Sequence, residues 1–398
     1  MSFVIQMSLQ AVPRHTELSN KLLKEVLVET SEKMPRPAVT RAYLRDLLEL
    51  TDPQEWEKQE DALWLRGDGE AIVLHCFRVG IYCAVACQCS PATDVRFNWA
   101  ALDRRATTLE KKTEDGHLVA LEASGLAMGY LAGTNNAFEA VRPILPVDTD
   151  YPDLRDREDE ASHRDWLEDF VFELRSDLSV NSPSEVFHQP LFSPENISEF
   201  ASEPRHIVVY FFDGLSCAGE AWQFWSDWYD GFLIGRPLNW ELQKRVASIE
   251  NAIWNAGAEA VAREIARLKV KMALEGLRRL QATSEGARHG VGGNYPPEAI
   301  EEANDLAFSS SLVWSAVGDI EEEIAKQAPN KGRVQAILRA LEAGLAGILK
   351  WCGRKADLAV DTTIKWSVPV VGGAYIAAHP DKIQALIKAI EEWLRFLS

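Results

Sequence analysis

The most informative part of the sequence is WQFWSDWYDGFLIGRPLNWELQKRVASIENAIWNAG, residues 222–257. Its first half repeats large apolar side chains at the intervals i, i+3, i+7, i+10 and i+11. These residues are Trp222, Trp225, Tyr229, Phe232 and Leu233. The spacing places them on one face of a helix for about three turns. The stretch therefore begins with a predicted helix that has one aromatic face.

The predicted helix ends at GRPLN, residues 235–239. Gly235 is a common helix stop, Pro237 discourages continuation, and Asn239 is a good N-cap for a second helix. The second helix carries its apolar side chains at helical spacing: Trp240, Leu242, Val246 and Ile249. The sequence thus predicts a tight helical hairpin, followed by a third helix over residues 258–281.

The tryptophans of this stretch are interpreted first as core residues, because large aromatics at helical spacing usually pack a helix against its neighbours. Trp228 lies off the aromatic stripe, and tryptophan is a favoured residue in interface hot spots. Trp228, together with Arg236 and Asn239 of the turn, is therefore the candidate contact with a protein partner. Asp227 and Asp230 beside the rings disfavour nucleic acid, since a base-stacking platform needs basic residues between its aromatics.

The tryptophan block carries a resemblance. Its pattern is W-x-x-W-x-x-W-Y, then L-x-G-R-P-L-N-W, and residues 290–298 later read GVGGNYPPE. This combination resembles a loose group of tryptophan-rich bacterial proteins that have no assigned activity. The resemblance covers residues 222 to about 268 and implies no catalytic residue.

In the rest of the chain, apolar residues at helical spacing predict further helices over residues 16–50, 70–88 and 107–132. The cysteines of residues 70–88 fall on one stripe without CxxC-like pairs, so they are interpreted as small core residues and not as zinc ligands. HIVVYFF, residues 206–212, is the best strand candidate, a β-branched and aromatic run closed by Asp213 and Gly214. The predicted fold class is mainly α, multi-helical, with at most a minor β element near residues 206–212 and a C-terminal helical bundle.

Prolines and acidic residues crowd residues 142–162, and glycines and prolines crowd residues 290–298, which marks two connections. The predicted organisation has five parts. They are an N-terminal helical domain (1–145), an acidic, proline-rich connection (146–205), a tryptophan-rich helical domain (206–282), a glycine and proline linker (283–298) and a C-terminal amphipathic helical region (299–398).

The C-terminal region contains a strongly amphipathic stretch, residues 333–357, ringed by lysines and arginines. A basic amphipathic helix either packs into a bundle or lies on a membrane surface. The candidate membrane or partner face consists of Leu341, Leu345, Ile348 and Leu349. The bundle is the favoured interpretation, and a membrane surface is considered for this region only.

The formal net charge of −18 opposes attraction to nucleic acid or anionic lipid, which carry the same sign. Six cysteines are too few and too clumped for a disulfide framework, and no secretory signal precedes them. No stretch reaches the length of uninterrupted apolar sequence that a membrane-spanning helix needs. We expect a cytoplasmic protein, with peripheral membrane attachment as the alternative.

Catalytic motifs are weak throughout the chain. The string GLSCA, residues 214–218, resembles the nucleophile elbow of serine hydrolases, with Ser216 as nucleophile and His289 or His379 as the downstream base. Its fifth position is Ala218 where that motif has glycine, and a hydrolase sheet needs several more strands. The histidines show no ligand spacing, so no metal, cofactor or catalytic residue is assigned.

Three functions follow from the sequence, in order of preference. The first is a non-enzymatic interaction or regulatory protein that docks a protein partner or a second copy through helical surfaces. The second is a conditional membrane-acting effector of the bacterial toxin or defence type, acting through the C-terminal helices. The third is a serine hydrolase.

Overall fold

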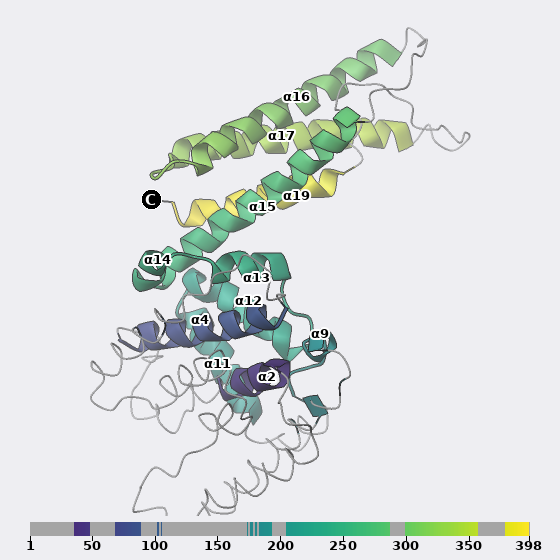
Figure 1. The fold of residues 1–398 in the computed structure, drawn as a ribbon. Helices are drawn as coiled ribbons and strands as arrows, with labels where there is room; N and C mark the ends of the chain where they lie inside the picture. The colour runs from purple at the N-terminus through teal and green to yellow at the C-terminus, as the bar shows by residue number, and fades with distance from the viewer. Residues whose placement is uncertain are drawn as a thin grey trace, which may run out of the picture. The chain divides into compact units, whose positions relative to one another are not determined.

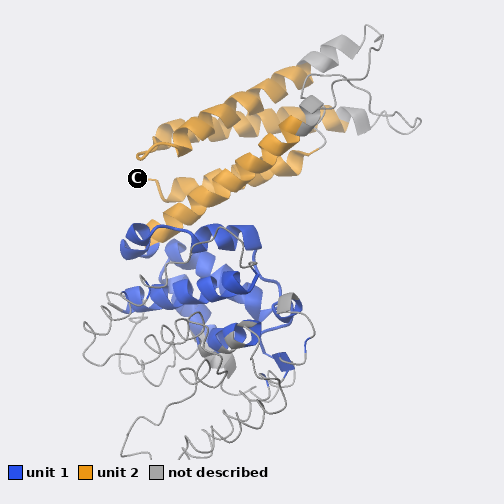
Figure 2. Ribbon diagram, viewed as in Figure 1, with its two compact units in different colours: residues 1–258 blue, residues 259–398 orange. Residues whose placement is uncertain are grey.

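The chain is described from a computed structural model, which is 84% helical and has no strand within the residues it describes. Those residues are 36–47, 68–88, 102, 105, 173, 176–177, 180, 183–192, 204–286, 299–356 and 379–397. They form two compact units, residues 1–258 and residues 259–398 (Figure 2). The predicted mainly α, multi-helical fold class is confirmed.

Unit 1 is built around one long apolar helix, α4 (Asp68–Gln88), which packs against α2 (Arg36–Asp46), α9 (Pro183–Val186) and α13 (Trp240–Ala247) (Figure 1). Its remaining helices are α11 (Pro204–Cys217), the 3-10 turn η4 (Glu220–Trp222), α12 (Gln223–Leu233) and α14 (Asn251–Asn255). The two helices predicted on either side of GRPLN are present as α12 and α13, and α13 packs mainly against α4. The aromatic stripe begins at Trp222 in the 3-10 turn η4 and continues along α12.

The predicted strand at residues 206–212 is wrong, because these residues lie inside α11. The helix starts at Pro204, a residue that is well tolerated in the first turn. It buries Phe211 and Leu215, four residues apart, and exposes Asp213 and Ser216. Burial at helical period has outweighed the β propensity of a short branched and aromatic run.

The core of unit 1 is an aromatic cluster that joins α4 to α12 and α14. Phe77 of α4 stacks on Trp225 at a centroid distance of 5.0 Å. Trp225 in turn meets Trp228 edge-on at 6.0 Å and Trp254 at 5.8 Å. Aromatic pairs in this distance range add to the area that the rings bury. The tryptophan-rich stretch is therefore the core of its unit.

Unit 2 is a bundle of α15 (Ala258–Gly286), α16 (Ala299–Ile324), α17 (Lys331–Ala356) and α19 (Pro380–Arg395). The helix α17 lies between α16 and α19 (Figure 1). Each helix turns a stripe of aliphatic side chains inward, with Val270, Val317, Leu341 and Ile390 among the fully buried ones. The predicted C-terminal helical bundle is confirmed.

The boundary between the two units falls after Ala258, at the first residue of α15. This point lies inside the range 206–282 that the sequence assigns to a single domain. The predicted connection 146–205 and linker 283–298 lie largely outside the described residues, so those boundaries stay predictions.

One described helix, Gly69–Gln88, is long and apolar enough to cross a membrane by length and composition. Its most apolar window is 83% buried inside the protein. A core helix passes the same composition test, and the position of α4 at the centre of unit 1 accounts for its apolar sequence.

Candidate docking surface

Trp228 does not lie on the surface, which corrects the expectation that it faces a partner. Its side chain is fully buried, and its indole Nε1 donates to Oε1 of Gln243 at 2.9 Å. The Gln243 amide in turn donates to the Leu238 carbonyl at 2.7 Å. The ring of Trp228 lies against Phe77 of α4, and Gln243 of α13 accepts from its N–H, so both helices contribute to the face of α12 that the stripe pattern left open. Trp228 is a core residue that fixes the hairpin.

Asn239 acts as the predicted N-cap of α13. Its side-chain oxygen accepts hydrogen bonds from the backbone amides of Glu241 at 2.9 Å and Leu242 at 3.2 Å. These bonds satisfy two of the amides that a helix start leaves without internal partners. The residue is exposed, but its polar side chain serves the turn.

The turn has a closely packed backbone. Gly235 adopts a φ of +69°, which side-chain-bearing residues rarely adopt, and Arg236 donates its backbone amide to the Gly231 carbonyl at 2.6 Å. A Cβ placed on Gly235 would lie 2.7 Å from the carbonyl oxygen of His188. The turn therefore packs backbone to backbone against residues 188–190.

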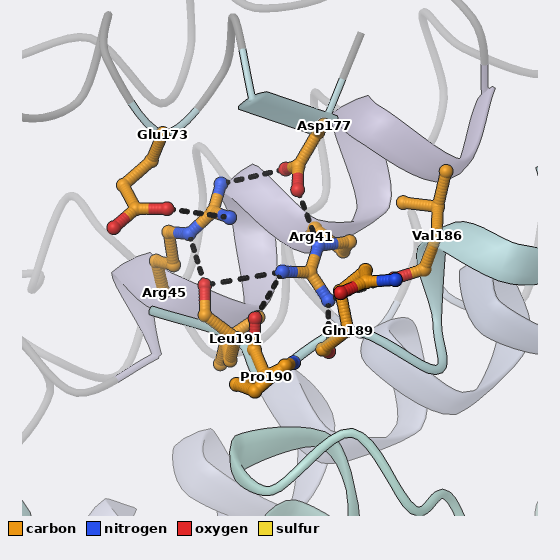
Figure 3. A network of polar contacts seen from close by, with 8 residues as sticks. All are labelled: Arg41, Arg45, Glu173, Asp177, Val186, Gln189, Pro190 and Leu191. Atoms are coloured by element: carbon orange, nitrogen blue, oxygen red, sulfur yellow. Dashed lines mark hydrogen bonds and ion pairs between the residues drawn. The ribbon is translucent and has the colours of Figure 1, made fainter. Parts of the chain in front are cut away.

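Arg41 holds that neighbouring segment from inside (Figure 3). It donates five hydrogen bonds, one to the Asp177 carboxylate and the others to backbone carbonyls. The carbonyls belong to Val186, Gln189, Pro190 and Leu191. A guanidinium whose donors are used in this way fixes the course of the chain over residues 186–191.

Arg45 completes the network, one turn further along α2 (Figure 3). It pairs with Asp177 at 2.8 Å and Glu173 at 3.5 Å, and it donates to the Leu191 carbonyl. Burial lowers the pKa of Arg41, and the Asp177 carboxylate opposes that effect. Two carboxylates therefore offset the cost of burying two cations.

The segment is also tied to the hairpin directly. Leu191 donates its amide to the Leu233 carbonyl at 3.1 Å. The ring of Phe187 meets Phe232 and Trp240 edge-on, each at a centroid distance of 5.6 Å. Buried contacts thus hold both residues 186–191 and the turn between α12 and α13 in place.

Together the two segments expose a surface, here called the docking surface. It consists of His188, Gln189, Pro190, Ile234 and Arg236. Ile234 is 51% exposed and is one of the few large aliphatic residues on the described surface of unit 1. The side chain of Arg236 forms no hydrogen bond or ion pair with any residue the structure describes. An unpaired arginine beside an exposed isoleucine is suited to contact another protein.

The nucleophile elbow predicted around Ser216 is not formed. This residue lies in the last turn of α11 and is exposed, so the strand and sharp turn of a nucleophile elbow are missing around it. Of the two candidate bases, His289 lies outside the described residues and His379 belongs to unit 2. No group of three metal-ligating side chains occurs among the residues described.

The candidate membrane face is mostly internal. Leu341 and Ile348 are fully buried in the core of the bundle, and Leu345 packs partly against it. Leu349 alone of the four is largely exposed, at 49%. The apolar stripe of α17 therefore holds unit 2 together.

The roles of Arg41 and Arg45 are not predicted by any pattern in the sequence. Their carboxylate partner Asp177 lies 136 and 132 residues further along the chain, so no local pattern links them. The available signal was the presence of two arginines four residues apart in a short helix. That signal does not distinguish a buried pair from a solvated one.

No protein-family model, curated protein or solved structure matches this chain. The resemblance to tryptophan-rich bacterial proteins therefore stays a prediction.

Proposed function

We propose that the chain is a non-enzymatic interaction protein that binds a protein partner through the docking surface. The proposal rests on one observation. Ile234 and Arg236 are exposed on a turn whose backbone is held in place by hydrogen bonds. A preordered surface loses little conformational entropy on binding, so more of the contact energy appears as affinity.

The chemistry of the surface favours one class of partner. Arg236 is suited to bind a carboxylate, because a guanidinium forms strong charge-assisted hydrogen bonds with one. Ile234 and Pro190 are suited to pack against an apolar side chain next to that carboxylate. The partner is therefore a protein that presents an acidic side chain beside an apolar one.

The test compares full-length wild-type protein with Arg236→Glu and Ile234→Asp in affinity capture from the source cells. Arg279→Glu is the matched control, since this arginine is highly exposed and lies on α15 of unit 2. We expect specific partners to be lost with both docking-surface variants and kept with the control. Capture that is the same for all four proteins would overturn the proposal.

Self-association is measured on the same four proteins by sedimentation velocity over a range of concentrations. Dissociation that appears only in Arg236→Glu and Ile234→Asp would identify a second copy of the chain as the partner. The membrane-acting alternative uses the apolar stripe of α17, so it requires the bundle to open before Leu341 and Ile348 can reach lipid.

A further inference from the structure

A second arginine environment in unit 1 differs from that of the docking surface. Arg78 lies on the central helix α4 and is only 3% exposed. Its Nη2 donates to the Tyr82 hydroxyl at 2.9 Å and to the side-chain oxygen of Asn251. Its guanidinium carbon lies 4.9 Å from the ring centroid of Trp254 and 5.3 Å from that of Tyr82. Every one of these neighbours is neutral.

No carboxylate in the described part of the chain pairs with Arg78. Burial lowers the pKa of Arg78, the Tyr82 hydroxyl opposes that effect, and the charge of a second cation, Arg105, adds to it. His75 adds no negative charge. Burial, Arg78 and Arg105 together lower the pKa of His75 to about 3, so the imidazole is neutral. The same unit supplies two carboxylates for Arg41 and Arg45.

Three N–H donors on neighbouring side chains of this part of the core have no acceptor among the described residues. They are Nε of Arg78 and the indole Nε1 atoms of Trp225 and Trp254, all enclosed and all without a hydrogen-bond partner among the described residues. The two indole rings lie 5.8 Å apart, and Arg78 lies against one of them. Roughly nine in ten buried polar atoms are paired, so three unmet donors on neighbouring side chains need an explanation.

The unmet groups are of one kind: donors beside an uncompensated positive charge. A buried cation without a counter-ion costs several kcal/mol, roughly, and an anion would remove that cost. Arg105 and Asn251 are half-buried, so one side of the cluster lies near solvent. A cationic or donor-only ligand would meet repulsion and no acceptor.

We propose that Arg78, Arg105, Trp225 and Trp254 form a binding site for a small oxyanion, the group shared by carboxylates and phosphates. Its negative charge balances the two guanidinium groups, and its oxygens accept from the unmet N–H donors. The site joins α4, α12 and α14, so occupancy stabilises unit 1 from within. This activity is independent of the docking surface.

The experiment follows the melting temperature of the full-length protein at constant ionic strength, with sodium chloride replaced stepwise by phosphate or by acetate. We expect a saturable rise for wild type with at least one of the two anions. Arg78→Gln should abolish the rise. Arg105→Gln should raise the anion concentration at half-saturation about tenfold, since it removes one charge-assisted contact.

Arg236→Gln is the matched control, because it removes an arginine from the docking surface of the same unit and should leave the rise unchanged. Phosphate also stabilises proteins in general, so a rise of equal size in all four proteins would be a salt effect and would overturn the proposal. A flat response of wild type to both anions would overturn it too.

Arg105→Gln keeps the test decisive if Arg78→Gln does not fold, since Arg105 has no hydrogen bond or ion pair among the described residues. Unchanged half-saturation in that variant would contradict the assigned site. A response to phosphate alone or to acetate alone identifies the source of the oxyanion.

Discussion

Single residues in unit 1 show two ways of burying an arginine. Arg41 directs its five hydrogen bonds at one carboxylate and four carbonyls, and it thereby fixes a surface segment. Arg78 has two neutral acceptors and two aromatic faces, and its Nε has no acceptor. The first arrangement is complete within the protein, as expected of a structural group. The second is suited to a ligand.

His75, one turn from Arg78, gives a prediction on pH. Its pKa is lowered to about 3, first by burial and then by the charges of Arg78 and Arg105. The unfolded chain has an ordinary histidine pKa of about 6.5, so it takes up a proton as the pH falls while the folded chain does not. Stability from this group is complete above that value and decreases as the pH falls toward 3.

We expect the free energy of unfolding to lose about 2 kcal/mol through His75 between pH 7 and pH 5. Urea denaturation of wild type and His75→Gln at both pH values measures it, because the difference between the two proteins removes the contribution of other groups. Parallel pH dependence in the two proteins would show that the imidazole is not held neutral.

Among the elements, the turn between α12 and α13 has a geometry that depends on one glycine. Gly235→Ala places a methyl group 2.7 Å from the His188 carbonyl oxygen in a backbone conformation of positive φ. We expect a loss of about 1–3 kcal/mol in urea denaturation, together with weaker partner capture because the docking surface shifts.

Gly276→Ala provides a control of opposite sign. This glycine lies inside α15, and a Cβ there would meet nothing within 4 Å. Alanine is the better helix former, so the control should gain about 0.5–1 kcal/mol. A Gly235→Ala protein as stable as wild type would contradict the packing of the turn on residues 188–190.

For the whole molecule, the division into two compact units predicts separable stability. Leu341 is fully buried in the bundle, and Leu341→Ala should cost unit 2 about 2–5 kcal/mol. Hydrogen exchange read by mass spectrometry should then speed up in α16, α17 and α19 and stay slow in α4 and α12.

Faster exchange in both units would mean that they unfold together. The same variant tests the membrane-acting alternative, since a loosened bundle exposes its apolar stripe. Leu341→Ala that still fails to sediment with anionic vesicles would count against that alternative, and sedimentation of the variant alone would favour it.

Features that depend on residues within a turn or two of each other could be predicted from the amino-acid pattern alone. The hairpin of α12 and α13, the Asn239 cap and the amphipathic helices of the bundle follow from local spacing and local hydrogen bonds. Those interactions join residues a few positions apart, so a linear pattern records them.

The remaining features depend on contacts in the tertiary structure. It buried Trp228 by placing Gln243 against its indole, made residues 206–212 helical, and paired Arg41 with a carboxylate 136 residues away. It also left Arg78 in the core with neutral neighbours. Each of these outcomes depends on which distant segments meet, because burial and charge pairing act through space and not along the chain.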